Sequence, residues 1–212
     1  MIDLYTWHTP NGRKVSIMLE EIGITYNVFP INIAKDEQFQ PHFLEVSPNN
    51  RIPAIVDKDN NNYSLFESGA ILMYLAEKSG KLINRSNSDE YYRTIEWLMW
   101  QMGGVGPMFG QVHHFVKYNK GKSAYAEERY SKEARRLYGV MDKRLGQHQY
   151  ISGKEYSIAD ISIWPWTARF DWQEIDLSEY KNVTRWYKDM ADRPAVQKGW
   201  LVPQNDQLIP SP

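Results

Sequence analysis

Near its N-terminus the chain reads Trp7-His8-Thr9-Pro10-Asn11-Gly12. The residues before this turn alternate apolar and polar side chains, which predicts a strand over residues 2–7. The residues after it repeat apolar side chains at helical spacing, which predicts a helix over 11–22 with Thr9 as its N-cap. Such a turn directs backbone N–H groups and the positive end of a helix dipole to one point, where anions such as a thiolate bind. An ordinary strand-to-helix turn without a ligand explains the same residues.

Size and charge limit the classes of protein to consider. The chain has 212 residues, of which 42% are hydrophobic, and a net charge of −1. This length suffices for a sizeable core, in one domain or in two small ones. The balanced charge gives no electrostatic basis for binding nucleic acid or an anionic membrane. No apolar run approaches the roughly 20 residues that span a bilayer, and no signal-peptide pattern opens the chain, so a cytoplasmic protein is expected.

The sequence contains no cysteine. Disulfide bonds, metal sites built on thiolates and a cysteine nucleophile are therefore excluded. Any thiol chemistry that this protein performs must use a sulfur atom that another molecule supplies.

The chain divides into two parts with different patterns. A polar stretch over 81–88 reads as a linker, and everything after it has helical periodicity. We therefore predict an α/β domain over 1–80 and an all-helical domain over 89–212. Within the first domain, the expected elements after the first helix are a strand over 26–33, a helix over 36–45, a strand over 51–56, a strand over 63–66 and a helix from 67 to about 78.

Two short motifs in the first domain suit a peptide ligand. Glu67 and Ser68 open a helix directly after a strand. There the serine hydroxyl and backbone N–H groups can hold a carboxylate, while the glutamate pairs with an ammonium group. Ile52-Pro53 precedes a strand, and if its peptide bond is cis, the Ile52 backbone stays available for an extended peptide. Plain helix capping and a tight turn are the alternatives for these two motifs.

Three further motifs lie in the helical part. Residues 101–110 contain four glycines and a proline, which indicates close approach of another backbone or a ligand, or a kinked helix. His113 and His114 are adjacent, whereas metal ligands on one helix face need a spacing of three or four, so no metal site is expected. Ser157 and Asp160 have the spacing of a capping box, a structural feature.

Taken in order, these motifs resemble the cytosolic glutathione transferase superfamily over nearly the whole chain. More closely, they are similar to bacterial Nu-class members, relatives of the fungal nitrogen-regulator prion. The resemblance implies a thioredoxin-like glutathione-binding domain, an all-α helical-bundle domain and a homodimer. It implies glutathione, reduced or as the disulfide, as a substrate, and no metal. The segments that carry the closer resemblance are Thr9–Gly12, Ser47-Pro48-Asn49-Asn50, Leu65–Ile71 and Trp100–Phe115.

The resemblance also implies an activity. Nu-class proteins reduce disulfide bonds with glutathione and have modest transferase and peroxidase activity, so the second substrate is a small disulfide, peroxide or electrophile. Our hypothesis is that Thr9 and Asn11 hold the glutathione thiolate where related folds carry a cysteine of their own. The alternatives are a conventional glutathione-conjugating transferase for electrophiles and a non-catalytic glutathione-binding regulatory protein.

Further site residues follow from the same resemblance. Glu67 and Ser68 are expected at the γ-glutamyl part of glutathione. Gln38 is expected at its glycyl end, and Arg51 with the backbone of Ile52, next to the expected cis-proline Pro53, at the cysteinyl and glycyl parts.

The helical domain is expected to contribute the remaining groups. Arg129 lies where an arginine of the neighbouring subunit reaches glutathione in this class. Its alternative is a surface ion pair with Glu133, four residues later on the same helix. The second substrate is expected near Phe109, His113 and Phe115.

Overall fold

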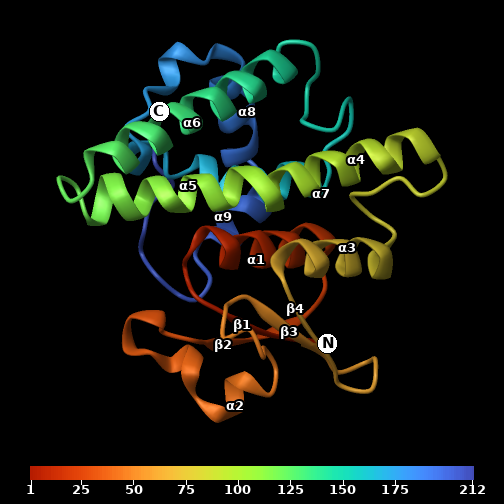
Figure 1. Cartoon of the computed structure of the whole chain (residues 1–212). Helices are drawn as coiled ribbons and strands as arrows, with labels where there is room; N and C mark the ends of the chain where they lie inside the picture. Colours follow the sequence, from red (N-terminus) through yellow and green to blue (C-terminus); the bar gives the residue numbers. More distant parts are fainter. The chain divides into compact units, whose positions relative to one another are not determined.

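The computed structural model describes all residues from 1 to 212, and they form two compact units (Figure 1). The first unit contains residues 1–81 and 192–209, and the second contains 82–191 and 210–212. The segment 192–209 packs with the first unit although it follows the helical segment in the sequence.

The first unit is built on a four-stranded mixed sheet with the strand order β2-β1-β3-β4. β1 is parallel to β2 and antiparallel to β3, and β4 returns antiparallel to β3 as a hairpin. Helices α1 and α3 cover one face of the sheet (Figure 1). This confirms the predicted α/β class. The elements are β1 (Ile2–Thr6), α1 (Pro10–Ile22), β2 (Tyr26–Pro30), α2 (Pro41–Leu44), β3 (Ala54–Asp57), β4 (Tyr63–Phe66), α3 (Ser68–Ser79) and α9 (Pro194–Trp200).

The predicted single helix over 36–45 is wrong. Two short 3₁₀ turns and α2 occupy the region between β2 and residue 45. Asp36 separates the turns with a left-handed backbone (φ 59°), and Pro41 begins α2 because proline suits the first helical position. The apolar side chains that suggested one helix therefore belong to separate turns.

Helix α1 lies in the centre of the first unit, and two glycines allow its close packing. A Cβ on Gly12 would lie 2.1 Å from the Trp7 carbonyl oxygen, so only glycine lets α1 begin this close to the end of β1. A Cβ on Gly199 would lie 2.6 Å from the Ile17 backbone, where α9 crosses α1. The Arg13 guanidinium stacks 3.3 Å from the centre of the Trp200 ring. These contacts explain why residues 192–209 belong to this unit.

The second unit is all-helical, as predicted. The glycine-rich stretch does not break its first long helix. The chain passes instead through π-helical turns at Gln101–Val105 and His113–Tyr118, on either side of α5. None of the helices combines the length and hydropathy that crossing a membrane requires. The α-helices are α4 (Ser88–Trp100), α5 (Gly106–Val112), α6 (Ala124–Leu145), α7 (Ile158–Thr167) and α8 (Lys181–Ala191).

The glycines of α5 lie beside side chains of the same unit. A Cβ on Gly106 would lie 2.7 Å from the Gln101 side-chain nitrogen, whereas a Cβ on Gly110 would lie 3.6 Å from the Trp166 indole, an ordinary contact distance. The close neighbour at Gly106 is therefore a side chain, where the sequence suggested a backbone or a ligand. Gly103 and Gly104 have open space around their Cα atoms.

The start of α7 forms the capping box that the sequence predicts. The fully buried Asp160 carboxylate accepts hydrogen bonds from the Ile151 N–H (2.9 Å), the Ser157 N–H (3.1 Å) and the Trp186 indole N–H (2.9 Å). Burial raises the pKa of Asp160 to about 6 and outweighs these donors. This carboxylate ties three segments of the helical unit together.

Candidate active site

A cavity of about 240 Å³ lies in the first unit, where the starts of α1 and α3 meet the approach to β3. Except for Phe66, every residue that lines it is one that the sequence predicts at the ligand site. The structure therefore brings residues from three separate motifs to one place. The lining residues are Asn11, Arg51, Ile52, Pro53, Phe66, Glu67 and Ser68.

The start of α1 has the capping arrangement predicted from sequence. Thr9 is the N-cap, and its Oγ1 accepts a hydrogen bond from the Gly12 N–H at 3.2 Å. A hydroxyl that accepts one hydrogen bond keeps its own hydrogen for a further acceptor. No acidic residue occupies the first turn, so no side chain there offsets the positive end of the dipole. With Asn11 lining the cavity beside it, this end of α1 suits an anion.

The approach to β3 presents a backbone edge beside the cavity. The Ile52–Pro53 peptide bond is cis, as the resemblance implies. The ladder of β3 begins at Ala54, and none of the turn and loop hydrogen bonds involves Ile52. Its N–H and C=O can therefore pair with an extended peptide.

The start of α3 has a strained backbone. Glu67 is its N-cap with φ 69° and makes no capping hydrogen bond through its side chain. A left-handed conformation in a non-glycine residue costs about 1 kcal/mol or more, and such strain concentrates at functional sites. The conformation leaves the Glu67 carboxylate exposed at the cavity, next to the buried Ser68 hydroxyl.

Behind this serine lies a buried lysine that the sequence analysis missed. The Lys14 Nζ donates a hydrogen bond to Ser68 Oγ at 3.1 Å, and only 1% of Lys14 is exposed. Burial lowers the pKa of Lys14 to about 7, and the nearby Glu67 carboxylate opposes part of this shift. A sequence signal existed, because Lys14 lies four residues before Met18 and thus on the apolar stripe of the helix.

Two other predicted residues do not line this cavity. Thr9 caps α1 as described, and Gln38 lies in the 3₁₀ turn Glu37–Phe39. Gln38 is buried, and its side-chain oxygen has no hydrogen-bond partner. Its role at the glycyl end of a ligand stays a prediction.

The predicted second-substrate residues lie in the helical unit and do not share one surface. Phe109 is fully buried, with its ring stacked on Tyr138 at 5.1 Å. Phe115 is partly exposed and stacks on Tyr130 at 5.4 Å. Their proposed role is untested, and the burial of Phe109 leaves it no surface for a substrate in this conformation. No group of three or more His, Asp or Glu side chains is arranged to hold a metal ion.

His113 is held in a neutral form by its surroundings. Burial and the nearby Arg169 lower the pKa of His113 to about 4. Its Nε2 lies 3.2 Å from the side-chain nitrogen of Gln173, whose oxygen accepts the Tyr138 hydroxyl at 2.6 Å. Because that amide nitrogen can only donate, His113 Nε2 accepts and its proton resides on Nδ1.

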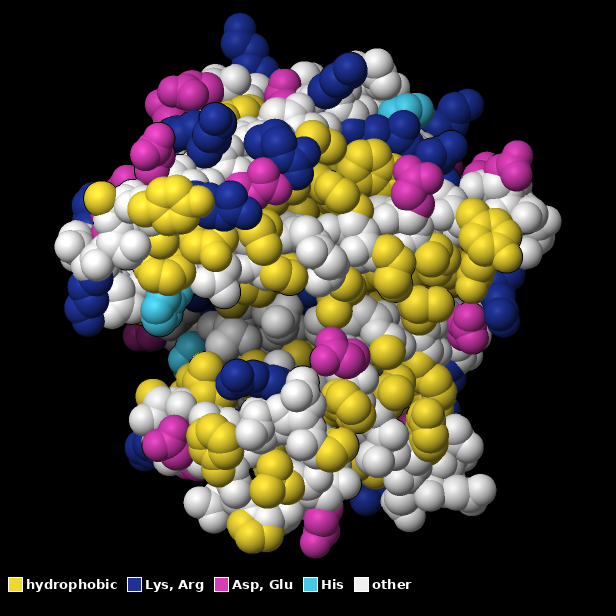
Figure 2. Space-filling view, viewed as in Figure 1, with side chains coloured by type: hydrophobic (Ala, Val, Ile, Leu, Met, Phe, Trp, Pro, Cys, Tyr) yellow, Lys and Arg dark blue, Asp and Glu magenta, His cyan; other side chains and the backbone are white.

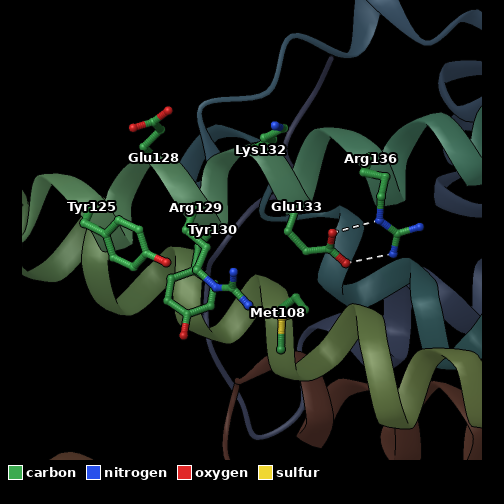
Figure 3. A pocket seen from close by; sticks show the side chains of 8 residues that line it. All are labelled: Met108, Tyr125, Glu128, Arg129, Tyr130, Lys132, Glu133 and Arg136. Carbon is green, nitrogen blue, oxygen red and sulfur yellow. Dashed lines mark hydrogen bonds and ion pairs between the residues drawn. The ribbon is translucent and has the colours of Figure 1, made fainter.

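Arg129 lines a second cavity, of about 610 Å³, between α5 and α6 (Figure 3). The ion pair with Glu133 that the helical spacing suggests is not formed. Glu133 instead binds Arg136 through two hydrogen bonds of 2.7 Å. Figure 3 shows the Arg129 guanidinium directed toward Met108 and separate from this pair. The lining residues are Met108, Tyr125, Glu128, Arg129, Tyr130, Lys132, Glu133 and Arg136.

Two family models match this chain. The model of the glutathione S-transferase N-terminal domain matches residues 1–77, and the model of the C-terminal domain matches residues 124–189. The chain belongs to the glutathione S-transferase family. The predicted resemblance and the predicted fold, a thioredoxin-like domain with a helical domain, are thereby confirmed.

Individual relatives within the glutathione S-transferase family are similar over almost the whole chain. The Escherichia coli (strain K12) disulfide-bond oxidoreductase YfcG is 46% identical over 96% of this chain and 96% of its own. A Pseudomonas fluorescens pf-5 family member, solved with two glutathione bound, is 46% identical with a TM-score of 0.89 over 94% of this chain and 92% of its own. A Pseudomonas putida glutathione transferase, solved with one glutathione disulfide per subunit, is 44% identical with a TM-score of 0.89 over 95% and 91%.

Proposed function

We propose that this glutathione S-transferase family member reduces disulfide bonds with electrons from glutathione. The observation that carries the proposal is a ligand cavity at a helix start in a chain without cysteine. The anion-binding end of α1 is present, but the sulfur that it would activate must arrive with a ligand. The similarity to a protein named disulfide-bond oxidoreductase supports this reading, as does the glutathione disulfide bound by the Pseudomonas putida relative.

Residues at and near the cavity are proposed to hold the three parts of the tripeptide. Glu67 and Ser68 hold the ammonium and carboxylate of the γ-glutamyl group. The Ile52 backbone pairs with the cysteinyl residue, and Arg51 and Gln38 hold the glycyl end. With this orientation the cysteinyl sulfur lies toward the start of α1.

Thr9 and Asn11 then act on the sulfur. Hydrogen bonds from the Thr9 hydroxyl and the Asn11 amide stabilise the thiolate and lower the pKa of the glutathione thiol. The thiolate attacks one sulfur of the substrate disulfide, which forms a glutathione mixed disulfide and releases the other sulfur as a thiolate that takes a proton. A second glutathione thiolate attacks the glutathione sulfur of the mixed disulfide. The products are glutathione disulfide and two thiols for each substrate disulfide and two glutathiones consumed.

The functional unit that we propose is a homodimer in which Arg129 reaches the glutathione of the neighbouring subunit. The guanidinium is exposed and makes no ion pair within the chain, so a carboxylate from another molecule can meet it. Figure 2 shows a band of hydrophobic side chains along α4 and α5. Tyr92 and Met99 are exposed on α4, and such a patch suits contact between copies. The second substrate is proposed to meet His113 and Phe115.

Turnover on two substrates tests the proposal. Purified protein is assayed with glutathione and either hydroxyethyl disulfide or chlorodinitrobenzene. We expect the catalytic efficiency for the disulfide to exceed that for the electrophile. The reverse order would identify a conventional conjugating transferase. Calorimetric binding of glutathione without turnover of either substrate would identify a glutathione-binding regulatory protein.

A further inference from the structure

Asn11, which lines the candidate cavity, is the one asparagine of the chain that a glycine follows. An asparagine side chain loses ammonia when the backbone nitrogen of the next residue attacks its Cγ atom. Glycine as that next residue favours the attack, because it has no side chain to hinder its nitrogen and restricts the backbone least. The sequence therefore carries its most labile amide at the candidate active site.

Neither residue of the Asn11-Gly12 pair is readily replaced. A Cβ on Gly12 would lie 2.1 Å from the Trp7 carbonyl oxygen, so any other residue there would displace the start of α1 from the end of β1. Asn11 is proposed above to donate to the glutathione thiolate. Packing and the proposed chemistry thus keep this labile pair together.

The folded structure restrains the pair in two ways. The Gly12 N–H, whose nitrogen would attack, donates to Thr9 Oγ1 at 3.2 Å. Asn11 is the second residue of α1, and helical backbone angles hold its Cγ away from the Gly12 nitrogen. Both restraints are released only when the start of the helix opens locally. The Thr9 cap therefore controls access to the reactive conformation.

We propose that Asn11 is a deamidation site, that the Thr9 cap limits the rate of its deamidation, and that the deamidated protein no longer holds the glutathione thiolate. The loss of activity rests on the proposed function. The reaction at Asn11 and its control by Thr9 do not depend on it.

The reaction needs only water and base. Base removes the proton from the Gly12 nitrogen, which forms a bond to Asn11 Cγ, while the bond from Cγ to the side-chain nitrogen breaks and ammonia leaves. Water then opens the resulting cyclic imide at one of its two carbonyl groups and gives aspartate or isoaspartate. One water is consumed and one ammonia is released, with no oxidation or reduction. Each product carries a new carboxylate.

This carboxylate forms at the place that suits an anion. The first turn of α1 contains no acidic residue, and the positive end of the helix dipole stabilises a negative charge there. The aspartate product therefore keeps a stable helix start. A bound thiolate would be a second anion beside the carboxylate, which raises the pKa of the glutathione thiol and opposes its ionisation. Deamidation thus yields a folded protein with low activity.

Peptide mapping by mass spectrometry measures the deamidation of Asn11 while the full chain is incubated at mildly alkaline pH. We expect Thr9→Ala to react about fivefold faster than the unmodified protein, because loss of an N-cap favours opening of the helix start. Thr9→Ser keeps the hydroxyl and should react at the unmodified rate. The matched control is Ser123→Ala, which removes the same kind of cap from α6 and should leave the rate at Asn11 unchanged.

Asn11→Asp reproduces the aspartate product without incubation. We expect its turnover of hydroxyethyl disulfide with glutathione to be about 100- to 1000-fold below that of the unmodified protein. Its unfolding by urea should match that of the unmodified protein, which separates loss of activity from loss of structure.

The outcomes separate this proposal from the proposed function. Equal deamidation rates at Asn11 in Thr9→Ala and the unmodified protein would overturn the role of the cap. Full activity of Asn11→Asp would overturn the inactivation and leave disulfide reduction standing. Absence of disulfide turnover by the freshly purified, unmodified protein would instead overturn the proposed function.

Discussion

At the start of α7, Asp160 accepts hydrogen bonds from three N–H groups and lies completely out of contact with solvent. At the start of α3, Glu67 makes no capping hydrogen bond, and its carboxylate is exposed beside a cavity. Asp160 lies in the first turn of a helix that follows an irregular segment, whereas Glu67 is the N-cap of a helix that directly follows β4. Hydrogen bonds within the chain cap the start of α7. The start of α3 instead lies at a cavity that a ligand can enter.

Each of these two places also contains a buried ionisable group, Asp160 at α7 and Lys14 behind α3. Asp160 has several donors around it, and the arrangement fixes the geometry of three segments. Lys14 has the Ser68 hydroxyl and the Coulombic influence of Glu67. The comparison teaches that one buried charge ties segments of the fold together, while the other supports a residue that lines a cavity.

The largest effect on activity is expected from Asn11→Ala, which removes a proposed hydrogen-bond donor at the start of α1. We expect disulfide reduction to fall by about 10- to 1000-fold, the range observed when one oriented donor to a developing charge is lost. Steady-state kinetics with hydroxyethyl disulfide measure the effect. Unfolding by urea should change little, because Asn11 lies at the cavity edge. Unchanged turnover would remove Asn11 from the mechanism.

Asp160→Ala removes the carboxylate of the capping box at the start of α7. We expect the free energy of unfolding to fall by about 2–4 kcal/mol, since several buried N–H donors lose their acceptor. Urea denaturation measures this loss. Turnover per folded molecule should stay near that of the unmodified protein. Asp176→Ala is the control, because Asp176 caps a short 3₁₀ turn at an exposed position, so a loss of only about 0.5–1 kcal/mol is expected.

His113→Asn tests how the buried Asp160 affects the pH dependence of the free energy of unfolding. The pKa of His113 is about 4 in the folded state, against an ordinary value of 6.5, so stability from this group falls as the pH drops from 6.5 toward 4. The slope is at most about 1.4 kcal/mol per pH unit. The raised pKa of Asp160 acts in the opposite direction, because stability from that group falls as the pH rises from 3.8 toward 6.

The two slopes partly cancel in the unmodified protein between about pH 4 and 6. In His113→Asn we therefore expect the urea midpoint to decrease with rising pH across this window. A midpoint that keeps the unmodified pH profile would show that His113 is protonated in the folded state.

The smallest effect is expected from Arg129→Ala. Loss of one exposed charge contact to glutathione disulfide should weaken its binding by about 1 kcal/mol, or roughly fivefold. Calorimetry measures the change. Lys132→Ala is the matched control, because Lys132 lines the same cavity on the same helix. Equal effects from both substitutions would indicate a general charge effect rather than a cross-subunit contact.

Features that depend on neighbouring residues in the sequence could be predicted well. The caps at Thr9 and Ser157, and the sequence of strands and helices around them, follow from local patterns. The motifs at Ile52 and Glu67 predicted cavity residues because a proline after a turn and a helix start after a strand are both visible in a few consecutive residues. Such features can be recognised without knowledge of the rest of the fold.

Features that depend on packing between distant segments could not be predicted. The burial of Lys14 results from the start of α3, which lies more than fifty residues later. The choice of Glu133 between Arg129 and Arg136 depends on side-chain orientation on α6, because both spacings are compatible with a helix. The helix predicted over 36–45 failed because apolar spacing cannot show where the backbone turns left-handed.

The docking of α9 on α1 has a consequence for synthesis of this protein. Arg13 and Ser16 donate hydrogen bonds to acceptors at Gly199, Trp200 and Gln207. While the ribosome translates the intervening helices, α9 has not yet been made, and one side of α1 remains uncovered. Its folding is therefore expected to complete only near the end of translation, and a chain cut before residue 192 should yield an N-terminal unit prone to aggregation and recognised by chaperones.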